Sequence, residues 1–150
     1  MTTTLTPSLA PGGIMWAPPV AAPGSGWAGP ARENGGALPV GRLRRVIEYI
    51  QQNLDKDLPL AELAALVCMS PFHFARLFKD STGLPPHRFV IRQRIARARV
   101  CLSTPDLSIA EISRRVGFRT PSHFATVFRR VTGVTPSRYR ARHRDEPIAR

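Results

Sequence analysis

Acidic residues are scarce in this chain of 150 residues, which carries 10 Asp and Glu against 22 Lys and Arg. The formal net charge is therefore +12. Arginine strongly outnumbers lysine, and its planar guanidinium suits bidentate contacts to phosphate and guanine. Positive charge often serves solubility alone, but this density of arginine favours a polyanionic partner. No apolar run approaches the length of a membrane-spanning helix, so we expect no membrane partner.

Cysteine is also rare, and the two present, Cys68 and Cys101, do not form a C-x-x-C motif. A reduced, cytoplasmic protein is the simplest interpretation of this count and spacing. The first residues lack both a basic start and a continuous apolar segment, so we expect no secretory signal.

Familiar enzyme signatures are missing as well, including the G-x-S-x-G motif and the Walker loop. The four histidines and two cysteines are too scattered to predict a metal set. Glu62 and Glu111 are better explained as residues at the starts of helices. We therefore expect no enzymatic activity, no cofactor and no metal site.

Proline and glycine, with alanine and threonine, dominate residues 1–38. Only Arg32 and Glu33 are charged there, and their charges cancel. Such a composition cannot sustain a helix or a central strand, so we expect a disordered tail. Trp16 and Trp27 could form a docking motif, although exposed aromatics in a flexible segment are the simpler interpretation.

One stretch, residues 70–83, carries the signals of a complete short helix. Ser70 is a good N-cap, Pro71 suits the first turn, and Gly83 can take the left-handed conformation that ends a helix. About fifty residues later, residues 120–133 repeat this pattern, and the match extends on both sides. The internal duplication predicts two copies of a helix-turn-helix.

The helical spacing of apolar residues predicts an all-α fold. Helices are expected over 41–53, 59–67, 70–83, 86–102, from 108 onward, over 120–133, and in a short segment after Thr135. The two helix-turn-helix motifs then lie at about 59–83 and about 108–133, joined by the long helix 86–102, within a domain of residues 39–145. On that joining helix, Arg94 is the arginine that we expect to be tied into the fold or to a phosphate.

Each capped helix is expected to bury one face and to leave the other for a partner. Phe74, Leu77 and Phe78 share the apolar face at helical spacing. The opposite faces carry Phe72, Ala75, Arg76 and Lys79 in the first copy, and Ser122, Ala125, Thr126 and Arg129 in the second. His73 and His123 occupy equivalent positions, which a duplicated structural or phosphate contact explains more simply than a ligand pair. The helix N-termini add backbone N–H groups for phosphates.

A long set of correctly spaced residues surrounds the second copy: Ile109-Ala110-Glu111-Ile112, Val116-Gly117-Phe118, Phe124, Phe128-Arg129, Gly133, Thr135-Pro136 and Tyr139-Arg140. With this set, residues 40–144 resemble the DNA-binding domain of the AraC/XylS family of bacterial transcription regulators. The resemblance implies about seven helices, with the helices over 70–83 and 120–133 entering successive major grooves.

Carried over residue by residue, the resemblance implies DNA contacts from both capped helices. These are Phe72, Ala75 and Arg76 in the first copy, and Pro121, Ser122, His123, Ala125 and Thr126 in the second. Combined with the face analysis, the expected DNA-binding set is Ser70, Phe72, His73, Ala75, Arg76, Lys79, Arg119, Thr120, Pro121, Ser122, His123, Ala125, Thr126 and Arg129.

The expected function is sequence-specific regulation of transcription, as an activator or a repressor, by a protein that binds double-stranded DNA as a monomer. RNA polymerase is the expected protein partner. Many family members carry a sensing and dimerising domain, and here only the Pro/Gly-rich tail precedes the DNA-binding part. We therefore expect the chain to be either a stand-alone regulator or a truncated relative. Two alternatives are a protein-interaction module acting as an antagonist on RNA polymerase or another regulator, and a nucleic-acid-modifying enzyme that uses this domain as its reader.

Overall fold

The computed structural model describes residues 36–144, and seven α-helices and no strand lie in that part of the chain. The helices are α1 (Val40–Gln52), α2 (Leu60–Ala65), α3 (Pro71–Thr82), α4 (Pro86–Leu102), α5 (Ile109–Arg115), α6 (Pro121–Thr132) and α7 (Pro136–Arg144). The all-α prediction is confirmed, with boundaries within a few residues of those expected. No helix among the described residues is long and apolar enough to cross a membrane.

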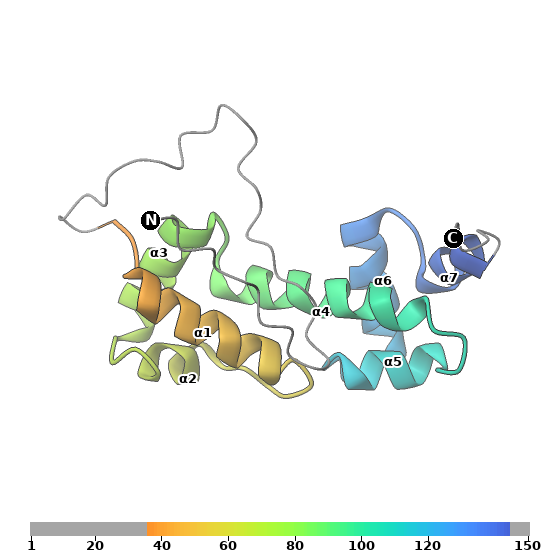
Figure 1. Cartoon of the computed structure of the whole chain (residues 1–150), viewed down its shortest axis with the longest axis horizontal. Coiled ribbons are helices and arrows are strands. Elements are labelled where there is room, and N and C mark those ends of the chain that lie inside the picture. The colour runs from red at the N-terminus through yellow and green to blue at the C-terminus, as the bar shows by residue number, and fades with distance from the viewer. Residues whose placement is uncertain (1–35, 145–150) are drawn as a thin grey trace, which may run out of the picture. The chain divides into compact units, whose positions relative to one another are not determined.

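Helix α4 belongs to two hydrophobic cores at once. Its first half contributes Phe89 and Val90 to the core built by α1, α2 and α3. Its second half contributes Ile95, Ala98 and Leu102 to the core of α5 and α6, against which Tyr139 of α7 also packs. Figure 1 shows α4 running from the first group of helices to the second. The long helix expected to join two helix-turn-helix units is therefore also a structural part of both.

The start of the folded domain differs from the expected residue 39. Leu38 is only 4% exposed and lies in the first core. Its backbone N–H donates to Ser81 Oγ at 2.7 Å, which ties the entering chain to the end of α3. Leu38 therefore belongs with the domain, whereas the rest of the expected tail up to residue 35, with Trp16 and Trp27, lies outside the described residues.

Both helix-turn-helix turns are built by the same backbone motif. In the first copy the N–H of Met69 donates to the carbonyl of Ala64 at 3.1 Å, and the N–H of Cys68 donates to Ala65 at 3.1 Å. In the second copy Phe118 and Gly117 make the same two bonds to Ser113 and Arg114, at 2.9 and 3.0 Å. This paired arrangement is the Schellman motif, which requires a left-handed residue after the helix.

That left-handed residue differs between the copies. Gly117 has φ +83°, and Cys68 has φ +56°, the only positive φ of a non-glycine residue in the described part. A side chain in this conformation costs about 1–2 kcal/mol, because its Cβ crowds the following carbonyl. The turn at Cys68 therefore carries a mild backbone strain that the turn at Gly117 does not.

We expect Cys68→Gly to stabilise the protein by up to about 1 kcal/mol, since relief of the strain outweighs the greater entropy of glycine in the unfolded chain. Chemical denaturation measures this difference. Cys68→Ala is the matched control, because it removes the thiol but keeps Cβ, and its stability should stay within about 0.5 kcal/mol of the wild type. A glycine variant no more stable than the alanine variant would contradict the explanation.

Candidate nucleic-acid interface

Contacts among neighbouring residues mark both ends of helix α3. Ser70 Oγ accepts a hydrogen bond from the N–H of His73 at 3.3 Å, and Pro71 occupies the first turn. At the other end Gly83 has φ +77°, and its N–H donates to the carbonyl of Lys79 at 2.8 Å. The hydroxyl of Thr82 donates to the carbonyl of Phe78 at 2.8 Å and closes the last turn. A 12-residue helix is marginal alone, so these contacts fix where it starts and stops.

Helix α6 repeats this construction almost atom for atom. Thr120 Oγ1 accepts from the N–H of His123 at 3.2 Å. Gly133 has φ +82°, and its N–H donates to Arg129 at 2.8 Å. Thr132 donates to the carbonyl of Phe128 at 2.8 Å, as its counterpart does in α3. The two helices are the same element, presented twice by one chain.

The buried faces of the two helices correspond to those expected from the sequence. Phe74, Leu77 and Phe78 are buried in α3, and Phe124, Val127 and Phe128 are buried in α6. The opposite faces are accessible: Phe72, His73, Arg76, Lys79, Ser122, His123, Thr126 and Arg129 are exposed, and Ala75 and Ala125 are half-buried. Phe72, Ala75, Arg76 and Lys79 thus share one face of α3, and Ser122, Ala125, Thr126 and Arg129 share the equivalent face of α6, while His73 and His123 lie beside these faces.

Phe72 is the outstanding member of this set. It is 84% exposed although it is a large aromatic residue in the first turn of α3. Burying such a side chain against a partner is worth about 1.5–3 kcal/mol. In α6 the equivalent residue is Ser122, so the two faces differ in their apolar character.

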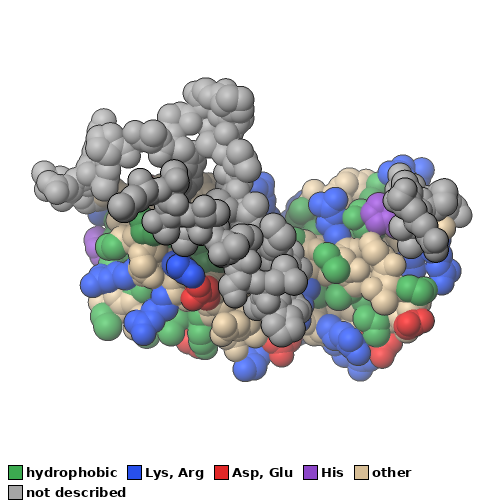
Figure 2. Space-filling view, viewed as in Figure 1, with side chains coloured by type: hydrophobic (Ala, Val, Ile, Leu, Met, Phe, Trp, Pro, Cys, Tyr) green, Lys and Arg blue, Asp and Glu red, His purple; other side chains and the backbone are tan. Residues whose placement is uncertain are grey.

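Basic side chains surround both helices. Figure 2 shows Lys and Arg spread widely over the visible face, with only a few Asp and Glu among them. On α3 and α6 the exposed cations are Arg76, Lys79, Arg129 and Arg130. The described residues hold no cluster of three or more His, Cys, Asp or Glu side chains that could bind a metal ion.

Arg119 occupies a different setting from the rest of the expected set. It lies in the turn before α6, and its Nη2 is 3.2 Å from Asp57 Oδ2 in the loop between α1 and α2. Both side chains are more than 80% exposed, so the ion pair contributes little stability and can be exchanged for another partner. Its contact with DNA stays a prediction.

Arg94 was expected to bind either the fold or a phosphate, and it binds the fold. Its guanidinium donates to two backbone carbonyls of the α1–α2 loop, Leu54 and Lys56.

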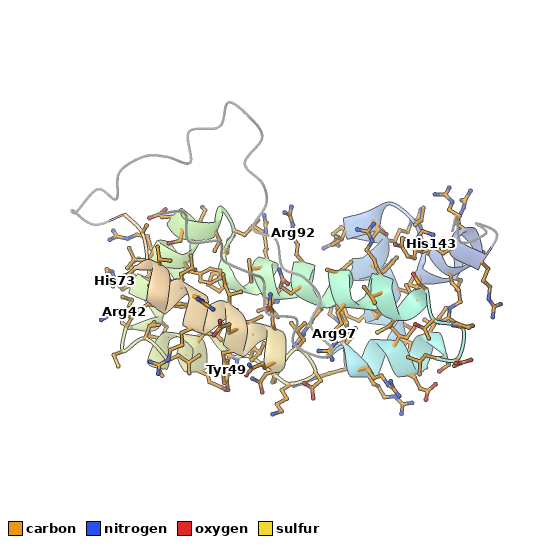
Figure 3. All side chains as sticks on the ribbon, in the orientation of Figure 1. Arg42, Tyr49, His73, Arg92, Arg97 and His143 are labelled. Atoms are coloured by element: carbon orange, nitrogen blue, oxygen red, sulfur yellow. The ribbon has the colours of Figure 1, made fainter. Side chains whose placement is uncertain are left out.

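Tyr49 of α1, labelled in Figure 3, connects α1 to α2, because its hydroxyl donates a hydrogen bond to Glu62. This hydrogen bond raises the pKa of Tyr49.

A groove between α4, α6 and α7 was not anticipated from the sequence. Its volume is about 490 Å³, and Arg92, Arg99, Val131, Tyr139 and Arg142 are among its lining residues. Arg99 Nε donates to the hydroxyl of Tyr139 at 3.1 Å, which fixes one wall. The only sequence trace of this groove is the seven-residue spacing of Arg92 and Arg99, which places them on one side of a helix. No carboxylate lines the groove, so it adds a second basic surface beside α6.

Comparison with known proteins identifies a matching family model and two similar relatives. Residues 63–142 match a family model described as a helix-turn-helix domain. The chain is 40% identical over 77 residues to the regulatory protein PocR of Salmonella typhimurium, covering 51% of this chain and 25% of that protein. It is 32% identical over 77 residues to the XylDLEGF operon transcriptional activator 2 of Pseudomonas putida, covering 49% of each. The chain therefore spans half or less of these relatives.

A solved structure covers most of the described domain. The DNA-binding domain of AdpA, a global transcriptional factor crystallised in complex with a target DNA, is 36% identical and superposes with a TM-score of 0.66. The match covers 69% of this chain and 93% of that domain. The seven-helix arrangement is thus shared with a domain that was captured on DNA.

The contribution of the N-caps to the free energy of unfolding should be measurable. We expect Ser70→Ala and Thr120→Ala each to cost about 1 kcal/mol, because each leaves a helix N–H without its acceptor, whereas Ser70→Gly should cost only a few tenths. Ser122→Ala, in the first turn of α6 but outside the cap, is the matched control and should change stability by less than about 0.5 kcal/mol. Equal unfolding free energies for the cap and control variants would show that the caps are not holding the helices.

Proposed function

Because this chain belongs to the AraC/XylS family of helix-turn-helix proteins, we propose that it regulates transcription by binding specific sites in double-stranded DNA. The observation that carries this proposal is the duplicated capped helix, with one face buried and the other exposed, on a chain of net charge +12. Helices α3 and α6 each enter a major groove, and the two grooves lie about one helical turn, roughly 34 Å, apart.

The first turns of both helices suit the phosphate backbone. N–H groups at a helix start lack helical partners and lie at the positive end of the helix dipole. Ser70 and Thr120 each satisfy one of these groups, and the neighbouring N–H groups can approach a phosphate. Contacts of this kind position a protein on DNA without reading its sequence.

Sequence reading falls mainly to α3. Arg76 is exposed on its outer face and can bond the O6 and N7 atoms of one guanine. Phe72, one turn earlier, can contact a thymine methyl group. Helix α6 presents Thr126 and Ser122 at these places, and Thr126 Oγ1 already donates to the carbonyl of Ser122 at 3.0 Å. That hydroxyl retains only acceptor capacity, so α6 discriminates less between bases.

We also propose a protein partner for this chain. Contact with RNA polymerase is part of the proposal, since one relative is named as a transcriptional activator. A protein-interaction module that does not bind DNA predicts instead that changes at Arg76 and Thr126 are tolerated. A nucleic-acid-modifying enzyme gains no support from the relatives, which are named as regulators.

Binding should depend steeply on salt and need one protein per site. If about six phosphates are neutralised, the logarithm of the association constant should fall with the logarithm of salt concentration at a slope near −5. One chain supplies two reading helices, so dimerisation is unnecessary. Gel shifts across a salt series, with sedimentation of the complex, measure both quantities. A stoichiometry of two proteins per site, or a footprint confined to one groove, would contradict the monomer.

The two half-sites should not be equally restrictive. We expect Arg76→Ala to relax base preference under α3, where a bidentate contact is typically worth about 1–3 kcal/mol of discrimination. Thr126→Ala should have a smaller effect under α6. Selection of binding sites from a random duplex library by the wild type and both variants measures this, with Arg88→Ala as a control that removes an exposed charge outside the expected DNA-binding set. If the half-site under α6 is the stricter one, the assignment of reading to Arg76 is wrong.

A further inference from the structure

Arg94 connects the two helix-turn-helix units at a point away from the axis of α4. Its Nε donates to the carbonyl of Leu54 at 3.0 Å, and its Nη2 donates to the carbonyl of Lys56 at 2.7 Å. Both carbonyls belong to the loop between α1 and α2. On the other side, the guanidinium carbon lies 5.9 Å from the ring centroid of Phe118, in the turn before α6. One half-buried side chain thus contacts a loop of the first unit and a turn of the second.

The electrostatics of this contact suit an arginine. Burial lowers the pKa of Arg94, while Asp57 and Asp55 act in the opposite direction. An arginine stays charged in such a place, whereas a lysine would more readily lose its proton. The planar guanidinium also spans two carbonyls at once, which the single ammonium of lysine does less well.

Gly117 shows how closely the two units approach. A Cβ on Gly117 would lie 2.1 Å from the carbonyl oxygen of Leu54 and 2.9 Å from the Cζ and Nε atoms of Arg94. The equivalent residue of the first copy, Cys68, carries a side chain at positive φ and is exposed. The turn itself therefore accepts a side chain at the cost of backbone strain, and the contact between the units adds a second reason for glycine at 117.

We propose that the junction formed by Arg94, Gly117 and the carbonyls of Leu54 and Lys56 fixes the orientation of α3 relative to α6. A continuous helix such as α4 sets a separation, but a contact beside its axis is needed to resist bending and twisting. In this role Arg94 is a positioning residue that acts through the loop carbonyls. Resting on the proposed function, the inference adds that this junction makes the protein require one spacing between its two half-sites.

Spacing is the readout that a merely structural role would not change. A site selected from random duplex DNA by the full chain is remade with one base pair inserted or deleted between its halves. Each step displaces one half by about 3.4 Å and rotates it by about 35°. For the wild type we expect the altered spacing to weaken binding by on the order of tenfold or more, the scale of a base mismatch. For Arg94→Met we expect a loss of about threefold or less.

Two controls separate the junction from charge and from packing. Arg88→Met removes one charge from an exposed arginine of the same helix and should keep the wild-type spacing penalty. Arg94→Lys keeps the charge but not the forked, planar guanidinium. Its spacing penalty should therefore lie between those of the wild type and Arg94→Met. Removing a positive charge lowers the DNA affinity at both spacings alike, so the ratio of the two affinities is free of this general effect.

The glycines provide a second matched pair. Gly117 and Gly133 have almost the same φ, +83° and +82°, but nothing lies within 4 Å of a Cβ at Gly133. Alanine at either position bears the same backbone strain, so both variants should lose similar stability from that source. Only Gly117→Ala should alter the preferred spacing, because only it pushes against the Leu54 carbonyl. Equal spacing penalties for the two alanine variants would overturn the proposal.

A measurement without DNA keeps the inference separate from the proposed function. Residual dipolar couplings of backbone N–H groups in α1–α3 and in α5–α7 should fit one alignment tensor in the wild type and two in Arg94→Met. If no site is selected from the library, the proposed function fails and the couplings still decide the junction. If the wild type already needs two tensors, or Arg94→Met keeps one tensor and the full spacing penalty, the junction does not position the helices.

Discussion

The division of α4 between two hydrophobic cores is the constraint on which the rest of this protein depends. Phe89 and Val90 complete one core, while Ile95, Ala98 and Leu102 complete the other. Neither unit could bury its apolar face fully without its half of α4, so the helix cannot be treated as a linker of free length. A helix rises about 1.5 Å per residue, so inserting or deleting residues would both change the separation of the cores and rotate one about the other.

The caps of α3 and α6 stabilise two helices that can each bury only one face. A helix that offers one face to a partner cannot use that face for its own stability, so the burial of Phe74 and Phe78, or of Phe124 and Phe128, must suffice. Side-chain caps at both ends limit fraying of the turns that carry the exposed residues. The exposure of Phe72 is consistent with this arrangement, because the first turn is held by the cap and not by burial of that ring.

Local features of this fold could be predicted from the sequence, and non-local ones could not. Ser70 and Gly83 mark their own helix because a cap involves residues only three or four positions apart. The burial of Leu38 depends on a bond to Ser81, 43 residues away, which no local pattern indicates. The acceptors of Arg94 are backbone carbonyls, and these are present at every residue, so the sequence could single out the arginine but not its partners. The groove beside Tyr139 could not be predicted either, because it forms where α4, α6 and α7 meet and so depends on tertiary packing.

The duplication supplies an internal comparison that a single copy would lack. Both turns form the same Schellman motif, so a difference between Cys68 and Gly117 cannot be attributed to the turn. What differs is the surroundings: the thiol is exposed, whereas the glycine faces the Leu54 carbonyl and Arg94. The same reasoning applies to Arg76 and Thr126, which hold equivalent places on identical scaffolds and differ only in what they present. Where two copies share a backbone, a residue that departs from its counterpart points to the task of its own copy.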